Sequence, residues 1–259
     1  MYQTIRYEKD GSIGIATINR PEALNALNST VISELEQLLT EIEKDDALRA
    51  LIITGEGRSF VAGADIGEQY PLDIAGGRKW GQRGSAVMRR IEKLEIPTIA
   101  AVNGFALGGG NELAMSCDIR VCSENAVFGQ PETGLGITPG FGGTQRLARL
   151  VSPGMAKQLI YAAKNIKAPE ALRIGLVNAV YPQEELLPAA QKLAAQIADN
   201  APIAVRACKK AINEGLELGM DDAIALEEKL FGECFETEDQ IGGMKAFLNK
   251  EKHPPYQNK

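Results

Sequence analysis

The sequence predicts an α/β core followed by a region built of helices. Up to Arg146, short apolar runs typical of buried strands alternate with longer stretches of helical periodicity. Beyond that point helical stretches follow one another with short breaks, and only 177–181 has the character of a strand. This order indicates an α/β domain with a helical extension. We therefore divide the 259 residues into a core over 1–200 and a C-terminal helical region over 201–259.

The N-terminal part of the chain predicts the edge of a sheet. Lys9-Asp10-Gly11 is a hairpin turn signal between two apolar runs. An amphipathic helix follows, with Asn28 or Ser29 available to cap it, and a buried strand comes next. The predicted elements are strands over 4–8 and 13–18, a helix over 28–43 and a strand over 50–54.

The stretch 55–65 predicts a glycine-containing loop that ends in Ala62, Gly63, Ala64 and Asp65. Small residues let a ligand approach the backbone closely, so that the amide of Ala64 faces a carbonyl oxygen. A tight turn capped by Asp65 explains the same residues equally well. A helix over 80–94 then returns the chain to the core.

The glycine triplet at 108–110 is the centre of the candidate site. It lies between a strand predicted over 99–102 and a helix predicted over 111–117, so the amides of Gly109 and Gly110 lie near the positive end of that helix. Such amides hold an anion or a developing oxyanion. Glu112, in the first helical turn, is carried to the same place. Tight packing and a solvated glutamate are the alternative interpretation.

A second carboxylate, Glu132, follows two further strands predicted over 118–122 and 126–129. Pro131 gives the backbone before it little freedom. Taken alone, Glu132 is equally well a surface residue of a loop. Together with Glu112 and the two glycine-containing loops, it indicates a site that holds two carboxylates and several bare amides.

The C-terminal part predicts helices that leave apolar side chains without cover. The predicted helices span 154–163, 169–174, 183–198, 204–214, 221–235 and 238–248. The apolar side chains in question are Leu230, Phe231, Cys234, Phe235, Met244 and Phe247. A short helical tail cannot bury them alone, so we expect them to pack on a neighbouring subunit.

Composition and motifs exclude several classes of function. His253, beside two prolines near the C-terminus, is the only histidine, and no G-x-S-x-G occurs, so triad hydrolases have no base or nucleophile elbow. Zinc spacing, a P-loop and a convincing dinucleotide fingerprint are also missing. The net charge of −6 argues against binding to nucleic acid. General acid and base chemistry by glutamate is left.

The sequence also indicates a location. The first residues lack the apolar core of a signal peptide, and no window approaches the roughly twenty apolar residues of a membrane span. The four cysteines, expected to be reduced, suit the cytoplasm.

Five motifs carry a family resemblance from end to end. They are NRPEALNAL at 19–27, FVAGADI at 60–66, NGFALGGGNELAMSCDI at 103–119, FGQPETGLGITPGFGGTQRL at 128–147 and EALRIGLVN at 170–178. With them the chain resembles the crotonase superfamily, that is, the enoyl-CoA hydratases and isomerases, and is most similar to bacterial short-chain enoyl-CoA hydratases (3-hydroxybutyryl-CoA dehydratases).

The resemblance implies an α/β fold of repeated ββα units wound into a spiral, with a C-terminal helical region used for trimerisation. A homotrimer or a homohexamer of two trimers is then expected. The implied activity is that of a lyase, the reversible syn hydration of short-chain trans-2-enoyl-CoA, such as crotonyl-CoA, to 3-hydroxyacyl-CoA. No cofactor other than the coenzyme A of the substrate, no metal, no nucleic acid and no membrane is implied.

The resemblance also implies roles for individual residues. The catalytic pair falls on Glu112 and Glu132, and the oxyanion-hole amides fall on Ala64 and Gly109. Further substrate-binding positions are Ala62, Gly63, Asp65, Ile66 and Gly140. Where many members carry a basic residue after A-G-A-D-I, this chain has Gly67, which leaves Arg58, Lys250 and Lys252 as the candidates for contact with the coenzyme A phosphates.

Other activities occur on the same scaffold, namely enoyl-CoA isomerisation, thioester hydrolysis and decarboxylation. Retention of both Glu112 and Glu132 favours hydration, because an isomerase works with one of them. An RNA-binding relative is the alternative that is not an enzyme, and it would need a basic helix face. The helix over 28–43 instead carries Glu34, Glu36, Glu41 and Glu43.

Overall fold

The computed structural model describes residues 2–259. Its core is a sheet of six strands in the order β1-β2-β3-β5-β7-β10, in which only β1 and β2 pair in antiparallel fashion. Three central strands are buried along their full length, as expected of parallel strands covered on both faces. The strands are β1 (Ile5–Asp10), β2 (Ile13–Ile18), β3 (Ala50–Gly55), β5 (Thr98–Val102), β7 (Ile119–Ser123) and β10 (Ala179–Tyr181).

Alternation along these strands feeds two separate hydrophobic clusters, since neighbouring side chains point to opposite faces of a sheet. In β3, Leu51 and Ile53 join the main cluster with the helices α1 (Ser29–Ile42) and α3 (Ile74–Lys93). Ile52 packs on the opposite face of the sheet. That second face is covered by α8 (Leu186–Ala198) through small residues such as Ala190 and Ala194.

A second, smaller sheet of four strands has the order β4-β6-β8-β9. Its strands are β4 (Ser59–Ala62), β6 (Phe105–Leu107), β8 (Val127–Gly129) and β9 (Ile166–Lys167). Successive strand pairs place one strand in each sheet: β3 with β4, β5 with β6, and β7 with β8. Helices follow these strand pairs along the chain, so the chain winds as a spiral of ββα units. This architecture confirms the predicted fold class.

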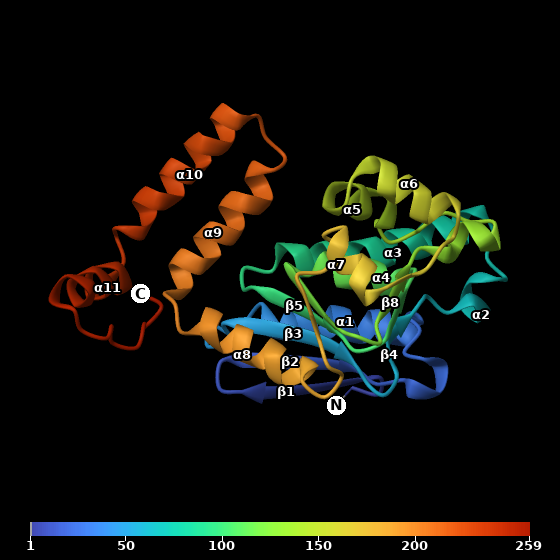
Figure 1. The fold of residues 1–259 in the computed structure, drawn as a ribbon, viewed down its shortest axis with the longest axis horizontal. Helices are drawn as coiled ribbons and strands as arrows, with labels where there is room; N and C mark the ends of the chain where they lie inside the picture. Colours follow the sequence, from blue (N-terminus) through green and yellow to red (C-terminus); the bar gives the residue numbers. More distant parts are fainter. Residues whose placement is uncertain (1) are drawn as a thin grey trace.

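The helices of the core connect these turns (Figure 1). They are α1 (Ser29–Ile42), α2 (Ile66–Gln69), α3 (Ile74–Lys93), α4 (Gly109–Ser116), α5 (Gly143–Leu150), α6 (Pro153–Tyr161) and α7 (Ala168–Arg173), with short 3-10 turns η1 (Pro21–Ala23) and η2 (Pro131–Leu135). Asn28 caps α1 through the amide of Val31, as predicted.

Several boundaries differ from the prediction. Helix α3 begins at Ile74, six positions before the expected start at residue 80, because the Asp73 side chain caps it through the amide of Gly76. The predicted loop 55–65 contains strand β4, and α5 was not predicted. Glycines around these elements mask their periodicity in the sequence.

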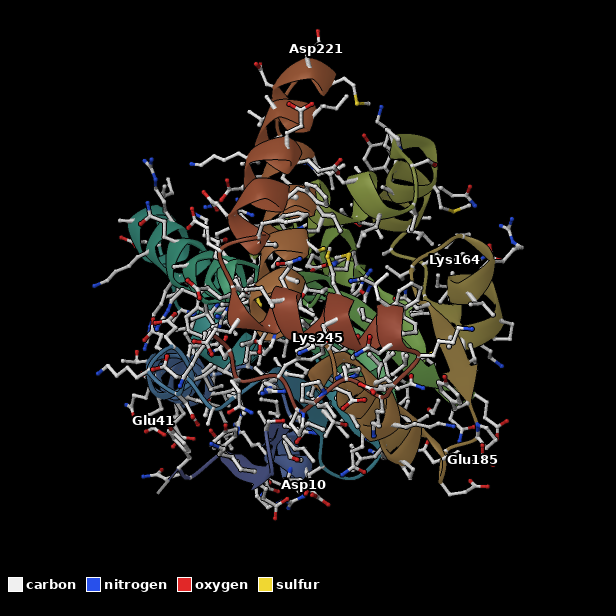
Figure 2. The ribbon with its side chains drawn as sticks, turned by 90° about the vertical axis from the view of Figure 1, so that its left-hand side faces the viewer. Asp10, Glu41, Lys164, Glu185, Asp221 and Lys245 are labelled. Carbon is white, nitrogen blue, oxygen red and sulfur yellow. The ribbon has the colours of Figure 1, made fainter. Side chains whose placement is uncertain are left out.

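The last three helices extend away from the core, as Figure 1 shows. They are α9 (Pro202–Gly215), α10 (Met220–Cys234) and α11 (Glu238–Asn249). Figure 2 shows Asp221 at the tip of the α9–α10 pair and Lys245 on α11. One expectation was wrong: Leu230 is only 6 % exposed, because α10 turns it toward the neighbouring helices. Phe231, Phe235, Met244 and Phe247 are exposed as predicted.

Helix α9 is attached to the core by a partly buried ion pair. Lys209 donates to Asp118 at 2.7 Å and to the carbonyl oxygen of Ile96 at 2.9 Å, and its side chain is 9 % exposed. Asp118 also accepts from the amide and hydroxyl of Thr98, which ties the ends of β5 and β7 to the same carboxylate. None of the helices over residues 2–259 combines the length and apolar character that a bilayer crossing requires.

Candidate active site

A cavity of about 170 Å³ lies where the second sheet meets α3, α4 and η2. All the predicted catalytic, oxyanion-hole and acyl-binding residues line it, with one exception. The lining residues among them are Ala62, Gly63, Ala64, Ile66, Gly109, Glu112, Glu132 and Gly140. The spiral therefore brings together both predicted carboxylates and both predicted amide positions, which lie up to 68 positions apart, between Ala64 and Glu132.

The exception is Asp65, which the structure places behind the cavity wall. Its carboxylate binds Arg20 at 2.8 Å and caps α2 through the amide of Gly67 at 3.0 Å. The hydrogen bond from Arg20 holds the pKa of Asp65 below its usual range, so the pair stays charged at neutral pH. Asp65 fixes the loop that carries Ala64 and does not face the cavity.

The amides of Ala64 and Gly109 lie side by side. A methyl group at Gly109 would be 3.4 Å from the nitrogen of Ala64. The loop before Ala64 is held by Leu27, whose amide donates to Gly63 at 2.9 Å and whose carbonyl accepts from Asp65 at 2.8 Å. Gly109 is the first residue of α4, where backbone N–H groups have no acceptor within the helix. The arrangement leaves two donors for one oxygen atom.

Two other glycines of the triplet are required by close approach. Gly108 has φ +50°, and a methyl group there would lie 2.9 Å from a carboxylate oxygen of Glu132. At Gly110 a methyl group would lie 1.9 Å from the carbonyl oxygen of Val61, inside the backbone of β4. The triplet thus lets α4 start directly against the second sheet.

Glu112 is 1 % exposed and is held by two amides of the loop before α5. Its Oε1 accepts from the N–H of Phe141 at 2.8 Å and of Gly143 at 2.6 Å. Burial raises the pKa of Glu112, while these two amides and the positive charge of Arg146 act in the opposite direction. Both hydrogen bonds end on Oε1, so Oε2 is left for the cavity.

Glu132 stands in η2 and is buried, as Glu112 is. Burial raises its pKa to about 7, its own backbone amide opposes the shift and the nearby Glu112 adds to it. Gln130 is fully buried, and with its amide nitrogen turned toward Glu132 it donates to the two carboxylate oxygens at 2.9 Å and 3.1 Å. No sequence pattern distinguishes Gln130 as a site residue, although it stands two positions before Glu132.

Aromatic and aliphatic side chains form the apolar part of the cavity. The rings of Trp80 and Phe141 are 6.2 Å apart and inclined at 43°. Leu135 and Ile137 complete this part of the lining. Gly84 of α3 allows the ring of Phe141 to approach, since a methyl group there would be 2.2 Å from it. Trp80 is the only tryptophan in the sequence, yet no sequence pattern marks it as part of the site.

The remaining candidates lie outside the cavity. Arg58, Lys250 and Lys252 are exposed, and none of them lines it. Burial raises the pKa of the thiols of Cys117 and Cys122 to about 12, so they stay protonated and unreactive. Residues 2–259 hold no cluster of three or more potential metal ligands.

Comparison with known proteins agrees with this geometry. The sequence pattern of the enoyl-CoA hydratase/isomerase family matches residues 8–259. The chain is 58 % identical to a short-chain-enoyl-CoA hydratase of Clostridium acetobutylicum over 97 % of both chains. It is 54 % identical to a crotonyl-CoA hydratase of Syntrophomonas wolfei, again over 97 % of both.

Solved structures give the same result for the fold. The crystal structure of an enoyl-CoA hydratase from Bacillus anthracis superimposes with a TM-score of 0.96 at 38 % identity, covering 99 % of this chain and all of the other. A subunit of an enoyl-CoA hydratase from Geobacillus kaustophilus gives 0.95 at 38 % identity, with 100 % and 99 % coverage. This chain belongs to the enoyl-CoA hydratase/isomerase family.

Proposed function

We propose that this protein catalyses the reversible hydration of short-chain trans-2-enoyl-CoA esters, crotonyl-CoA above all, to 3-hydroxyacyl-CoA. The observation that carries the proposal is the meeting of two buried carboxylates with two adjacent backbone amides in one cavity. Two relatives that are 58 % and 54 % identical are named for the hydration of short-chain enoyl-CoA and of crotonyl-CoA.

The first step of the mechanism is polarisation of the thioester. The carbonyl oxygen accepts hydrogen bonds from the amides of Ala64 and Gly109, and negative charge grows on it as the β-carbon is attacked. Two preorganised donors stabilise that enolate-like state, and the loss of one such donor costs about 10²- to 10³-fold in rate.

The two glutamates then move protons at neighbouring carbons. Glu112, whose anion is supported by two amides, takes a proton from water as the water oxygen bonds to the β-carbon. Glu132, whose pKa of about 7 keeps about half of it protonated near neutral pH, gives its proton to the α-carbon. Dehydration uses the same atoms in reverse. Proton exchange with solvent then returns Glu112 to its anion and Glu132 to its acid form, and the cycle needs no cofactor beyond the coenzyme A of the substrate.

The test is the loss of enone absorbance when the purified protein meets crotonyl-CoA, with longer trans-2-enoyl-CoA esters measured alongside. We expect rapid loss that is fastest for the four-carbon ester. No loss with any ester, in protein shown to be folded, would contradict the proposal and direct attention to isomerisation or thioester hydrolysis.

We further propose that the protein works as a homotrimer or a homohexamer of two trimers in the cytoplasm. Helix α10 packs mainly on α9, and the faces of α9–α11 expose Phe231 at 66 % and Phe247 at 82 %. A second copy of the chain offers a matching apolar face. The four unpaired thiols support a reducing compartment.

A further inference from the structure

We propose that Arg146 and Glu92 are positioning residues that hold the Gly140–Gly143 loop, and through it the carboxylate of Glu112, in the catalytic geometry. This inference rests on the proposed hydration activity. Neither residue lines the cavity, and neither belongs to the catalytic pair or to the amides that hold the substrate carbonyl.

The contact between the two side chains is a two-point clamp. Arg146 of α5 donates from Nε to one oxygen of Glu92 at 2.6 Å and from Nη2 to the other at 3.1 Å. The Arg146 side chain is 13 % exposed and that of Glu92 is 22 % exposed. A bidentate pair of this kind fixes the plane of the guanidinium as well as its position.

The remaining nitrogen of the guanidinium reaches the loop. Nη1 of Arg146 donates to the carbonyl oxygen of Phe141 at 2.6 Å. A methyl group at Gly142 would lie 2.3 Å from that nitrogen, so the guanidinium rests directly on the loop backbone. Phe141 is therefore held at both ends: its N–H binds Glu112 and its C=O binds Arg146.

The chain of contacts thus runs from α3 to the reacting carboxylate. Glu92 fixes the orientation of the Arg146 guanidinium, and the guanidinium holds the carbonyl group of Phe141. The amides of Phe141 and Gly143 then hold Oε1 of Glu112. The held carbonyl belongs to the peptide between Phe141 and Gly142, which lies between the two peptides whose N–H groups bind Glu112, so rotation of this middle peptide would displace those N–H groups. Misplacement of a reacting group by about 1 Å costs on the order of 10²-fold in rate.

Charge acts in the same direction as geometry. The groups that face Glu112 are Glu132 from η2 and Arg146 from α5, and Arg146 is itself faced by Glu92 from α3. Burial opposes ionisation of Glu92, but hydrogen bonds from Arg146 and Arg89 outweigh it and lower its pKa. Removal of the guanidinium leaves Glu112 without its nearest positive charge, which raises the pKa of Glu112 further.

The test compares Arg146→Met, Arg146→Lys and, as a matched control, Arg89→Gln. Arg89 binds the same Glu92 carboxylate at 2.9 Å but is 57 % exposed and does not reach the loop. We expect both Arg146 variants to lose about 10- to 100-fold in kcat on crotonyl-CoA with little change in KM, and Arg89→Gln to keep wild-type kcat. We expect only Arg146→Met to move the acid limb of the pH profile to higher pH, because Arg146→Lys keeps a positive charge near Glu112.

A second readout does not need activity. Trp80 is the only tryptophan and its ring lies 6.2 Å from that of Phe141, so its fluorescence reports the position of the loop. We expect the emission of Arg146→Met and Arg146→Lys to differ from wild type while that of Arg89→Gln does not. If Arg146→Met fails to fold, Arg146→Lys carries the test.

The outcomes separate this inference from the proposed function. Folded Arg146 variants with wild-type kcat, pH profile and Trp80 emission would overturn the positioning role, whatever their melting temperature. A wild-type protein that does not hydrate crotonyl-CoA would overturn the proposed function instead, and the Trp80 emission would still decide whether Arg146 holds the loop.

Discussion

Glu112 and Glu132 have the same side chain, and their surroundings give them different chemistry. Both are buried, but Glu112 accepts two loop amides that favour its anion, whereas the proximity of Glu112 disfavours the anion of Glu132. We assign the role of base to Glu112 because its carboxylate accepts two amides, and the role of acid to Glu132 because burial raises its pKa. This is the division of roles that hydration needs, because water must lose a proton on one side while the α-carbon gains one on the other.

The first prediction is that kcat/KM has the same bell-shaped pH profile for hydration and dehydration. Both directions use the singly protonated pair, so activity falls when that proton is lost and again when a second one is added. We expect the basic limb near pH 7, where Glu132 ionises. Initial rates from both sides of the equilibrium, measured over pH 5–10, check this. Because the reaction takes up no net proton, the equilibrium itself requires equal profiles in the two directions, so a profile that does not fall near pH 7 is the result that would contradict a shared proton.

The second prediction concerns removal of each carboxylate. Glu112→Gln and Glu132→Gln should each lose about 10²- to 10⁴-fold or more in hydration rate, because each loses a proton-transfer group in the transition state. Binding of acyl-CoA should persist, since the amides of Ala64 and Gly109 are unchanged. Stopped-flow kinetics and calorimetric titration with a saturated acyl-CoA measure the two effects. A variant with near wild-type turnover would show that the glutamate it lacks takes no part in proton transfer.

The third prediction is that ionisation of Glu132 lowers the free energy of unfolding as pH rises. Its folded pKa of about 7 lies above its usual 4.5, so its favourable contribution is complete below pH 4.5 and is lost as pH rises through 7. The full difference is on the order of 3 kcal/mol. We expect Glu132→Gln to lose this part of the pH dependence, as measured by urea unfolding at pH 5 and pH 8. An equal change in both proteins would contradict the raised pKa.

At the scale of residues, the sequence predicts the pair and its amides but not their supports. Glu112 and Glu132 stand in long motifs whose chemistry can be argued residue by residue. Gln130 between a strand and a proline looks like an ordinary loop residue, and only burial reveals its role. Glu92 and Arg146 are 54 positions apart and meet because α3 and α5 pack together, which no local pattern contains.

Among the elements, the short strands of the second sheet place the site. Strand β4 ends at Ala62, directly before the loop that carries Ala64, and β6 ends at Leu107, directly before the triplet. The two strands are parallel neighbours, and Ala62 pairs with Leu107. Parallel pairing therefore delivers both amide-bearing loops to the same edge.

The fourth prediction tests that arrangement with Gly110→Ala. The added methyl group would lie 1.9 Å from the carbonyl oxygen of Val61, so α4 must move away from β4 and carry Gly109 away from Ala64. We expect destabilisation by about 1–3 kcal/mol and a loss of hydration rate of about 10²-fold or more. Urea unfolding and crotonyl-CoA turnover measure the two effects.

The control for this substitution is Gly77→Ala in α3, where an added methyl group meets nothing within 4 Å. Because alanine favours a helix over glycine, we expect a gain of about 0.5–1 kcal/mol and unchanged turnover. Equal behaviour of the two variants would mean that contact with Val61 does not fix α4.

The sequence predicts the long elements better than the short ones. Helix α1 has four turns of clear periodicity and an Asn cap, and its bounds agree with the prediction within a residue. Strands β4, β6 and β9 contain two to four residues, too few for alternation to be recognised. Their existence depends on partners in the second sheet, which are far away in the sequence.

For the molecule as a whole, the projection of α9–α11 leaves an apolar surface that the chain does not cover. Phe231 and Phe247 are two of its exposed side chains, at 66 % and 82 %. Large exposed apolar patches are typical of protein interfaces. The prediction from sequence and the exposure in the structure agree on Phe231, Phe235, Met244 and Phe247.

The fifth prediction is that Phe231→Glu combined with Phe247→Glu dissociates the oligomer. Two charges on each copy make burial of this face unfavourable, so the mass measured by light scattering after gel filtration should fall to that of one chain. The control is Tyr161→Glu on α6, where a side chain 72 % exposed lies outside the three helices. A monomeric wild-type protein, or a double variant with wild-type mass, would contradict the interface.

The strand order of the main sheet has a consequence for synthesis on the ribosome. Each strand after β2 pairs with the strand of the same sheet that came before it in the chain. The sheet therefore grows from one edge, and no later strand has to be inserted between two earlier ones. Every turn of the spiral can dock on a finished turn as it emerges, which keeps unpaired strand edges brief. The clamp from Glu92 to Arg146 closes once residue 146 has left the tunnel, well before the helices that reach toward other copies are made.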